Sequence, residues 1–301
     1  MITSTSNSRI KEVVRLRKQA KERSLRGLFL TEGEKMFLEA PAQRVEQIFV
    51  SETFLRKNEQ REEIRTLLEK LPHEEVSDSV FAYMSDTDSP QGVLCLIRQY
   101  QYTEEALLTK RTISAGAGND DPEESMPEER ITQILKPGEK ASPGKKPAPL
   151  CLALEKLQDP GNLGTILRSA EGAGVTGILL SADCVDIYNP KVIRSTMGSV
   201  YRVPFLYAED QGDFFKKLES WKEKGICLYA AHLQGKNSYD QEDYTEPAAF
   251  LIGNESRGLT QETAGLADKK IRIPMQGQVE SLNAAVAASL LVFEAARQRR
   301  D

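Results

Sequence analysis

The sequence predicts an α/β protein of two domains, a small α/β domain over residues 1–100 and a parallel-sheet domain over residues 150–301. Three observations support this prediction. A chain of 301 residues is too long for one ordinary core. From residue 150 onward, short apolar runs alternate with helical patterns, as in parallel sheets covered on both faces. Residues 101–149 are rich in proline, glycine and charge, which predicts a partly disordered linker with one or two helical turns at residues 130–135.

The composition is that of a soluble globular protein, with 40% hydrophobic and 28% charged residues. The longest nearly apolar run, residues 284–293, is too short to span a membrane, and the polar N-terminus lacks the apolar core of a signal peptide. We therefore expect a cytoplasmic protein without a membrane partner. Four widely spaced cysteines and two histidines indicate neither a disulfide framework nor a metal site.

The first expected element is a basic amphipathic helix that begins after a cap at Ser6 or Asn7. Apolar residues recur at helical spacing, and residues 8–27 carry eight basic side chains against two acidic ones, although the whole chain has a net charge of -5. A solvated charged face would account for such a helix, but an excess of one sign favours RNA. The candidate RNA-binding residues are Arg9, Lys11, Arg15 and Lys18.

The other elements follow from periodicity and turn residues. In the first domain we expect strands at residues 28–31, 47–50 and 92–97, and helices at 34–39, 52–71 and 79–84. In the second we expect strands at 150–154, 177–180, near Val203, and at 226–231, 249–252 and 270–273, with helices at 163–173, 190–197, 213–224, 260–267 and 282–297. Ligands of such sheets bind beyond the carboxyl ends of the strands.

Three motifs occur at such strand ends: residues 162–168 (NLGTILR), residues 253–259 (GNESRGL), and residues 273–277 (IPMQG) followed by 280–283 (ESLN). In this order they resemble the motifs of the SpoU-type (TrmH-like) RNA ribose 2′-O-methyltransferases of the SPOUT superfamily. The resemblance implies a deep trefoil knot in the C-terminal domain, S-adenosylmethionine as cofactor, and a homodimer with active sites completed across its interface. No glycine-rich dinucleotide motif competes with this interpretation.

The N-terminal region carries a looser resemblance, in Ile2-Thr3-Ser4 with Asn7, Ile10 and Lys11, and then in residues 29–33 (FLTEG). It looks like the substrate-binding domain that often precedes the SpoU fold and is similar to certain RNA-binding ribosomal proteins. The family normally joins the two domains by a much shorter connector, so residues 101–149 depart from its pattern.

Gly253 ends an apolar run, where a glycine lets the backbone turn sharply or approach a ligand. Considered alone, it would be an ordinary turn residue. The resemblance implies that the backbone of Gly253, Ile273 and Leu282 meets the adenine of the cofactor. The complete set of expected cofactor-binding residues is Gly253, Asn254, Gly258, Ile273, Met275, Gly277 and Leu282.

Arg168 lies inside a predicted helix, where an arginine is usually a surface residue, but the resemblance makes it the leading catalytic candidate. A guanidinium with a pKa above about 12 gives up its proton reluctantly. We therefore expect Arg168 to hold a phosphate and to stabilise the developing alkoxide. Glu255 could orient that guanidinium or take the proton. The expected catalytic set is Arg168, Asn162, Glu255, Ser281 and Asn283.

Two members of this set have plainer interpretations. Asn162 could be a turn residue, and Ser281 could cap the long C-terminal helix. Asn283 would lie in the first turn of that helix, where packing does not explain an amide side chain.

The sequence thus predicts a methyltransferase acting on a ribose 2′-hydroxyl of rRNA or, as a second choice, tRNA. Two alternatives stay open: a catalytically silent RNA-binding or ribosome-assembly factor, and a methyltransferase acting on a base nitrogen. In-line methyl transfer requires no metal, and none is expected.

Overall fold

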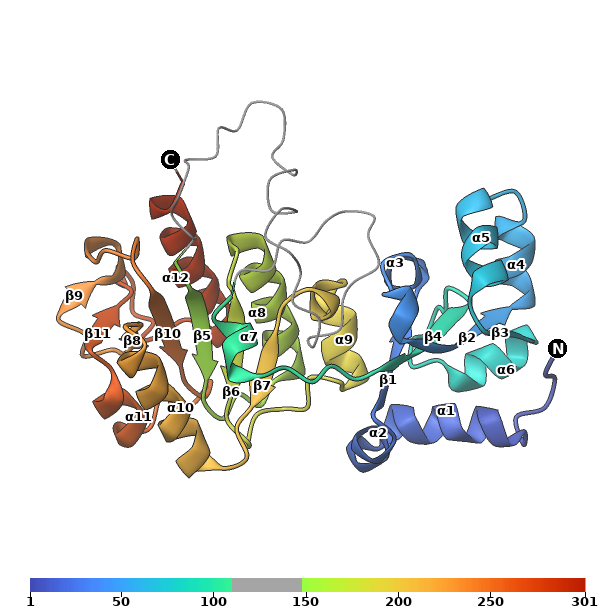
Figure 1. Ribbon diagram of the computed structural model, residues 1–301, viewed down its shortest axis with the longest axis horizontal. Helices are drawn as coiled ribbons and strands as arrows, with labels where there is room; N and C mark the ends of the chain where they lie inside the picture. Colours follow the sequence, from blue (N-terminus) through green and yellow to red (C-terminus); the bar gives the residue numbers. More distant parts are fainter. Residues whose placement is uncertain (110–147, 301) are drawn as a thin grey trace. The chain divides into compact units, whose positions relative to one another are not determined.

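The computed structural model describes residues 1–109 and 148–300, which form two compact units (Figure 1). The N-terminal unit contains Met1–Tyr100 and Asp186–Tyr201, and the C-terminal unit contains Gln101–Val185 and Arg202–Asp301. Division of the sequence at residues 100 and 150 did not anticipate that residues 186–201 pack with the N-terminal unit.

The N-terminal unit is built on a four-stranded mixed sheet of order β1-β4-β2-β3. Strand β4 is antiparallel to both β1 and β2, and β3 is parallel to β2. The strands are β1 (Leu28–Glu32), β2 (Val45–Ser51), β3 (His73–Val76) and β4 (Val93–Arg98). The helices are α1 (Ser8–Lys18), α2 (Ala20–Arg26), α3 (Glu34–Leu38), η1 (Ala42–Arg44), α4 (Glu52–Asn58), α5 (Glu62–Lys70), α6 (Asp78–Met84), α9 (Pro190–Thr196) and η3 (Ser199–Tyr201).

Helix α1 has the predicted amphipathic form. Asn7 is its N-cap and accepts a hydrogen bond from the backbone N–H of Arg9, at 2.9 Å. Ile10, Val13 and Leu16 are buried in the core of this unit. The apolar face therefore packs on the sheet, and the opposite face carries the lysines and arginines.

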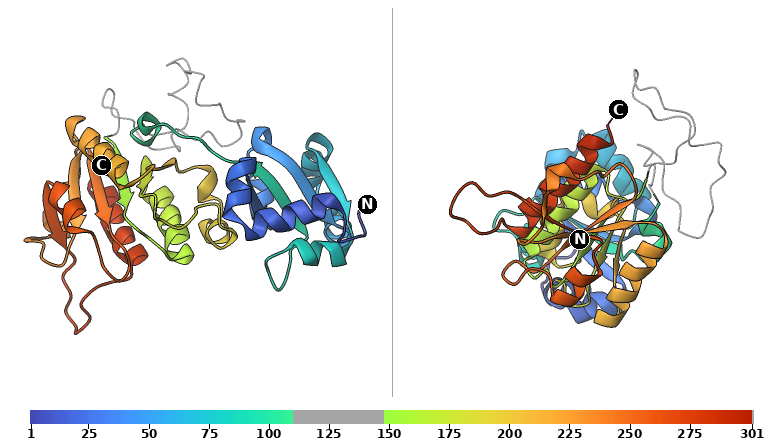
Figure 2. Two further views of the ribbon diagram at one scale, coloured as in Figure 1. Left: turned by 90° about the horizontal axis from the view of Figure 1, so that it is seen from below. Right: turned by 90° about the vertical axis from the view of Figure 1, so that its left-hand side faces the viewer.

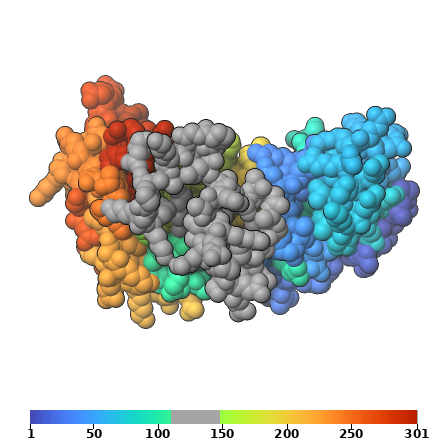
Figure 3. Space-filling model, turned by 45° about the horizontal axis from the view of Figure 1, so that its top comes forward, coloured from blue at the N-terminus to red at the C-terminus, as the bar shows by residue number. Residues whose placement is uncertain are grey.

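Two predictions for this unit were wrong. The expected helix at 52–71 is two helices, α4 and α5, and this part of the chain forms the light-blue surface in Figure 3. The side chain of Asn58 bonds back to the carbonyl of Phe54, and the carbonyl of Asn58 then accepts from Arg61 N–H, which makes a turn instead of a further helical repeat. Strand β3 was missed because it is a polar edge strand in which Val76 alone is fully buried.

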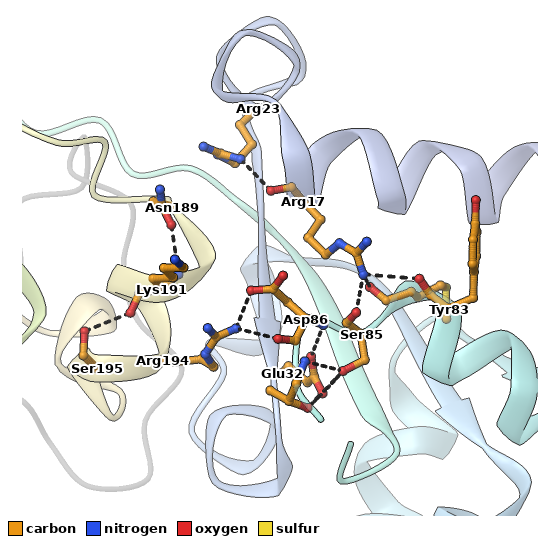
Figure 4. Close-up of polar contacts among 12 residues, drawn as sticks. Arg17, Arg23, Glu32, Tyr83, Ser85, Asp86, Asn189, Lys191, Arg194 and Ser195 are labelled. Carbon is orange, nitrogen blue, oxygen red and sulfur yellow. Dashed lines mark hydrogen bonds and ion pairs between the residues drawn. The ribbon is translucent and has the colours of Figure 1, made fainter. Parts of the chain in front are cut away.

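Residues 186–201 are fixed to the rest of the N-terminal unit by polar and aromatic contacts. Arg23, 3% exposed, donates to the carboxylate of Asp186 from Nε at 3.0 Å and from Nη2 at 2.6 Å. Arg194 on α9 pairs with Asp86 at 2.7 Å, as Figure 4 shows. The ring of Tyr188 stacks on a phenylalanine of β1 at a centroid distance of 4.6 Å. A buried cation with a carboxylate partner is costly to disrupt, so this segment is an integral part of the unit.

Four of the eight basic residues counted near the N-terminus have partners, and for Arg9 and Arg26 these are the carboxylates of Glu74 and Glu12. Arg17 donates to the carbonyls of Tyr83, Met84 and Ser85 at the end of α6, which stabilises the negative end of that helix (Figure 4). Arg23 is buried and forms an ion pair with Asp186. The cationic surface of α1 and α2 is therefore smaller than the sequence suggested.

The C-terminal unit contains a seven-stranded sheet of order β7-β6-β5-β10-β8-β11-β9 in which every strand pair is parallel, as the sequence predicted. The strands are β5 (Leu150–Leu154), β6 (Gly177–Leu180), β7 (Phe205–Tyr207), β8 (Cys227–Ala231), β9 (Asn237–Ser238), β10 (Ala248–Ile252) and β11 (Lys269–Arg272). The helices are α7 (Glu104–Leu107), α8 (Pro160–Ala173), α10 (Gln211–Glu223), η4 (Tyr239–Gln241), α11 (Gln261–Leu266) and α12 (Ala284–Gln298).

Helices cover both faces of this sheet, and the left view of Figure 2 shows α7 and α10 on one side and α8 and α12 on the other. Leu107, Phe214 and Trp221 pack against one face together with Cys151 and Ala153. The alternate strand residues are equally buried on the opposite face. Near-continuous apolar strands are what a doubly covered parallel sheet requires.

Helix α7 lies inside the region predicted as linker. Leu107 is fully buried in the core of the C-terminal unit. A β-carbon at Gly177 would lie 2.4 Å from the Cα of Leu107, so the glycine is what lets α7 approach β6. The ordered domain therefore begins before residue 109, and the predicted turns at 130–135 fall outside the described residues.

Two boundaries and one strand of this unit also differ from the predictions. Asp159 caps α8, whose first residue is Pro160, so Asn162 lies in the first helical turn and not in a loop. Strand β7 begins after Pro204, which has no N–H to donate, and so excludes Val203. The two-residue strand β9 was not anticipated. Among the described helices, none combines the length and apolar character needed to cross a membrane.

Candidate active site

A cavity of about 700 Å³ opens beyond the carboxyl ends of β8, β10 and β11, where a parallel sheet is expected to bind its ligand. Its lining comes from residues 231–234, 252–259, 271–276 and 280–282, and from Ala284, Ala287 and Leu291. Six expected cofactor residues line it: Gly253, Asn254, Gly258, Ile273, Met275 and Leu282. Gly277 does not line the cavity, whereas its neighbour Gln276 does.

Gly253 makes the close turn that forms one wall of this cavity. The backbones of Asn254 and Gly258 exchange two hydrogen bonds, at 3.1 and 2.9 Å. A β-carbon at Gly253 would lie 2.1 Å from the carbonyl carbon of Gly258 and 2.2 Å from the nitrogen of Leu259. Such distances exclude any side chain, so the folded-back shape of residues 253–259 requires glycine at this position.

Glu255 is held by hydrogen bonds from four donors. Its carboxylate accepts from the backbone N–H of Gln158 at 3.3 Å and of Asp159 at 3.0 Å. It also accepts from the side-chain amides of Asn162 at 3.1 Å and Asn254 at 3.3 Å. Burial raises the pKa of Glu255, but hydrogen bonds, first that from Asp159, outweigh burial and bring the pKa below its ordinary value. The side chain is therefore an ionised brace between residues 254–258 and the start of α8, and is poorly suited to accept a proton.

Asn162 and Asn283 extend this network. The amide of Asn283 donates to the side-chain oxygen of Asn162 at 2.8 Å. The side-chain oxygen of Asn283 accepts from the N–H groups of Ala285 at 2.9 Å and Val286 at 3.3 Å, which makes Asn283 the N-cap of α12. Three of the expected catalytic residues, Glu255, Asn162 and Asn283, thus form one hydrogen-bonded chain.

The cap of α12 corrects two predictions. Ser281 does not cap the helix; it lies upstream of Asn283, is exposed, and lines the cavity. Asn283 does not lie within the first turn but precedes it, and it has a structural role after all. The hydroxyl of Ser281 has no hydrogen-bond partner among residues 1–109 and 148–300 and is available at the cavity wall.

Arg168 lies apart from the cavity of its own chain. It is exposed on α8, is not part of the described lining, and makes no ion pair with Glu255 or with any other described carboxylate. The adjacent face of α8 packs on α12: the hydroxyls of Ser169 and Ser289 are 2.7 Å apart. A β-carbon at Gly172, one turn after Arg168, would lie 3.3 Å from the ring of Phe293.

Helix α12 exposes an apolar stripe beside this face. Val286 is 48% exposed, Leu290 37% and Phe293 44%, at spacings of four and three residues. Such spacing places all three side chains on one side of the helix. Helix α12 therefore has one buried apolar face and a second apolar face that is exposed.

The segment after β8 contributes cavity residues that the motifs did not indicate. His232 and Gln234 line the cavity, and the Nδ1 of His232 accepts a hydrogen bond from the N–H of Gln234 at 3.1 Å. In the neutral ring the proton is then on Nε2, which can donate to a ligand. The sequence could have indicated His232 as a cavity residue only by its position, because residue 232 directly follows a buried parallel strand.

The lining fits S-adenosylmethionine in size and chemistry. A cavity of about 700 Å³ is within the range of small-molecule sites. Ile252, Ile273 and Leu291 supply apolar surface for a flat base. Glu280 and Arg272 supply one charge of each sign, as the amine and carboxylate of an amino-acid group require. In residues 1–109 and 148–300, no group of three His, Cys, Asp or Glu side chains is placed to hold a metal ion.

The expected RNA-binding residues lie on α1 in the N-terminal unit. Arg9 pairs with Glu74, and hydrogen bonding to that carboxylate raises the pKa of Arg9. Lys11, Arg15 and Lys18 are exposed and have no ion-pair partner among the described side chains. Three of the four cations are therefore free to meet a polyanion.

Comparisons with known proteins agree with this geometry. The SpoU rRNA methylase family model matches residues 149–293, and a model of an MRM3-like substrate binding domain matches residues 7–95. A protein of Synechocystis sp. named as an uncharacterized tRNA/rRNA methyltransferase is 32% identical, covering 99% of this chain and 94% of that protein. The 23S rRNA (guanosine(2553)-2′-O)-methyltransferase of Bacillus subtilis is 26% identical over 97% of both chains.

Among solved structures, an AdoMet-bound rRNA methyltransferase from Sinorhizobium meliloti superimposes with a TM-score of 0.76 at 26% identity, covering 100% of this chain and 98% of that one. The family model spans the sheet and all three motif segments that line or brace the cavity. A relative that is 32% identical matches nearly the whole chain. The chain therefore belongs to the SpoU rRNA methylase family.

Proposed function

We propose that this protein is an S-adenosylmethionine-dependent methyltransferase that modifies a ribose 2′-hydroxyl of rRNA. The observation that carries the proposal is the cavity in which residues 253–259, 273–276 and 280–282 converge. Relatives named as rRNA 2′-O-methyltransferases, and an AdoMet-bound structural neighbour, support rRNA over tRNA. They also favour an enzyme over a catalytically silent factor.

The cofactor site is proposed to be held by main-chain groups. Gly253, Ile273 and Leu282 line the cavity, and their main-chain N–H and C=O groups are proposed to read an adenine edge as a base pair does. When bound, S-adenosylmethionine supplies an electrophilic methyl group on a sulfonium. The chain of Glu255, Asn162 and Asn283 keeps residues 253–258 and the start of α12 in place. Their proposed role is pre-organisation of the pocket and not proton transfer.

Ser281 and Arg168 are the proposed polar groups for the acceptor. The free hydroxyl of Ser281 can receive and orient the 2′-hydroxyl at the cavity wall. Arg168 is proposed to hold the neighbouring phosphate and to stabilise the alkoxide as its proton leaves.

A homodimer would bring Arg168 to a cavity. Arg168 lies one turn before Gly172, which approaches the ring of Phe293 in the exposed apolar stripe, and it does not line the cavity of its own chain. Burial of such a stripe against a second copy is the expected outcome for exposed apolar side chains at helical spacing. We therefore propose that Arg168 of one subunit serves the cavity of the other.

The deep trefoil knot remains part of the proposal. Strand β11 lies beyond β8, away from β5, and α12 then returns to pack on β10 and α8. That return path is compatible with a threaded chain. A crystal structure in which residues 273–283 pass outside the loop of residues 253–260 would contradict the knot.

The free cations of α1, namely Lys11, Arg15 and Lys18, are proposed to contact the phosphate backbone of rRNA. Arg9 would do so only by exchanging Glu74 for a phosphate.

The test of the proposed function is methyl transfer in vitro. Purified protein is incubated with labelled S-adenosylmethionine and with rRNA or tRNA from cells that lack the gene. We expect label in rRNA at a linkage that resists alkaline cleavage, because a methylated 2′-oxygen cannot attack the adjacent phosphate. Label in a base would indicate the base-nitrogen alternative, and cofactor binding without transfer to any RNA would indicate the silent factor.

A further inference from the structure

A second cavity lies beside the first in the C-terminal unit. It has a volume of about 630 Å³ and is lined by residues 254–260 together with Lys156, Gln158 and Asp183. Lys156 and Gln158 follow β5, and Asp183 follows β6, so this cavity also opens at the carboxyl edge of the sheet. No motif considered above includes Lys156 or Asp183.

The two cavities share residues 254–259 as a common wall. Gly253 forces this wall into its folded-back shape, and Glu255 fixes it to the start of α8. In-line transfer needs the attacking oxygen close to the methyl donor and opposite its leaving group. If the first cavity holds the donor and the acceptor oxygen, RNA backbone bound in the second cavity lies next to them along this wall.

Two cations of the second cavity have no structural task. The ammonium of Lys156 and the guanidinium of Arg257 make no hydrogen bond or ion pair with any side chain in the described parts of the chain. The side chain of Arg257 is exposed, and that of Lys156 is half-buried. Unpaired cations at the edge of a cavity attract phosphate.

The backbone at Lys156 is held in an unfavourable conformation by its surroundings. Its φ is 54°, in the left-handed region, where lysine is uncommon. The N–H of Lys156 donates to Ser181 at 2.9 Å, and its carbonyl accepts from the amide of Asn254 at 2.8 Å. These two bonds fix the backbone of Lys156 beside the shared wall in a conformation that is unfavourable for lysine.

The acidic groups of this cavity do not cancel the two cations. The carboxylate of Glu255 already accepts from four N–H donors, which offset its charge locally. Asp183 is exposed at the rim. An anionic ligand can therefore approach Lys156 and Arg257.

From this geometry we infer that the second cavity binds the RNA backbone beside the target nucleotide, with Lys156 and Arg257 on the phosphates next to the modified ribose, whose 2′-hydroxyl reaches Ser281 in the first cavity. The inference rests on the proposed function and assigns two specificity and positioning residues to the acceptor side of the same site. It separates acceptor recognition at the wall from the broader phosphate contacts proposed for α1.

The experiment compares Lys156→Ala and Arg257→Ala with the unaltered protein. Lys216→Ala is the matched control, since Lys216 is exposed on α10 and lines neither cavity. We measure kcat and KM for rRNA, the Kd for S-adenosylmethionine by calorimetry, and RNA binding in the presence of S-adenosylhomocysteine by filter retention. The last measurement does not depend on turnover.

We expect KM and the RNA Kd to rise about tenfold in each cavity variant, the loss of one charge-assisted contact to phosphate. The slope of log Kd for RNA against log salt should fall by about 1 per variant, because one fewer counterion is released. Cofactor affinity should not change. Arg257→Lys should recover most of the binding by restoring the charge.

Three results would overturn the inference: RNA affinity and salt slope equal to those of the control, a loss of cofactor affinity instead, or no recovery by Arg257→Lys. A loss of cofactor affinity would assign the second cavity to the methyl donor. If the unaltered protein transferred no methyl group to any RNA, the proposed function would fail, and RNA binding by the variants would still decide the role of the cavity.

Discussion

At position 253 the backbone leaves no space for a β-carbon, and this makes Gly253 the most sensitive single residue of the cofactor pocket. We predict that the methyl group of Gly253→Ala pushes residues 258 and 259 away from residue 253. This should lower the free energy of unfolding by about 1–3 kcal/mol and weaken cofactor binding at least tenfold. Gly265→Ala is the control, because a β-carbon there meets nothing within 4 Å inside α11. Urea denaturation and calorimetry measure both effects. Unchanged cofactor affinity in Gly253→Ala would refute the proposed pocket wall.

Glu255 predicts a pH dependence of stability. Its pKa is lowered in the folded chain, so its hydrogen bonds stabilise the fold above the ordinary glutamate pKa and are lost as pH falls through the lowered value. We therefore expect the difference in unfolding free energy between the unaltered protein and Glu255→Gln to be full at neutral pH and to shrink below about pH 4.5. A difference that stays constant from pH 7 to pH 3 would show that the carboxylate charge has no part in the brace.

The sequence brought Glu255, Asn162 and Asn283 together as expected partners of one site, but it assigned their roles through a family likeness. Periodicity could not show that Glu255 meets four donors, because three of those contacts span more than ninety positions of the chain. Nor could it show that Arg168 is absent from the cavity lining of its own chain.

At the level of elements, α12 begins at a residue with two separable tasks. Asn283 caps the helix through its oxygen and donates to Asn162 through its nitrogen. We predict that Asn283→Ala lowers the free energy of unfolding by about 1–2 kcal/mol, whereas Asn283→Asp keeps the cap and removes only the donor. Thermal unfolding at neutral pH should rank unaltered protein, Asp variant and Ala variant in that order. Equal loss in both variants would mean that the bond to Asn162, and not the cap, supports α12.

Most elements were predictable because their signals are local. The alternation of apolar strands and capped helices in the C-terminal unit identified six of its strands. The strand expected near Val203 is β7, which begins at Phe205. The missed elements, β3, β9 and α7, are short and polar or lie within a biased segment. Tertiary contacts, such as the close approach of Leu107 to Gly177, create α7 and leave little trace in composition.

At the scale of the whole molecule, the exposed stripe of α12 predicts an assembly. Leu290→Glu places a charge in the proposed interface and should convert a dimer into a monomer, which light scattering after gel filtration detects. Leu25→Glu is the control, because Leu25 is 75% exposed on α2 in the other unit. A monomeric unaltered protein, or a dimeric Leu290→Glu variant, would contradict the interface.

The same assembly predicts complementation between two inactive variants. Arg168→Ala lacks the proposed electrostatic group, and Gly253→Ala lacks a cofactor pocket. If Arg168 serves the partner's cavity, subunits mixed by dissociation and reassociation should regain methyl transfer, since each mixed dimer has one complete site. No recovery, with mixed dimers verified by mass spectrometry, would place Arg168 at the cavity of its own chain.

The sequence could not indicate that residues 186–201 pack with the N-terminal unit. Their polar anchors, Asp186 and Arg194, bond to Arg23 and Asp86, and each of these four residues alone is typical of a solvated surface. The partners are more than a hundred positions apart, and no periodic pattern encodes such pairs.

The central claim is that one cavity joins a methyl donor to an rRNA ribose. The most direct measurement is a map of ribose methylation in rRNA from cells with the gene, without it, and with the Arg168→Ala variant in its place. The account predicts that a defined 2′-O-methyl group disappears on deletion, returns with the unaltered gene and does not return with the variant. An rRNA methylation map identical in all three strains would contradict it.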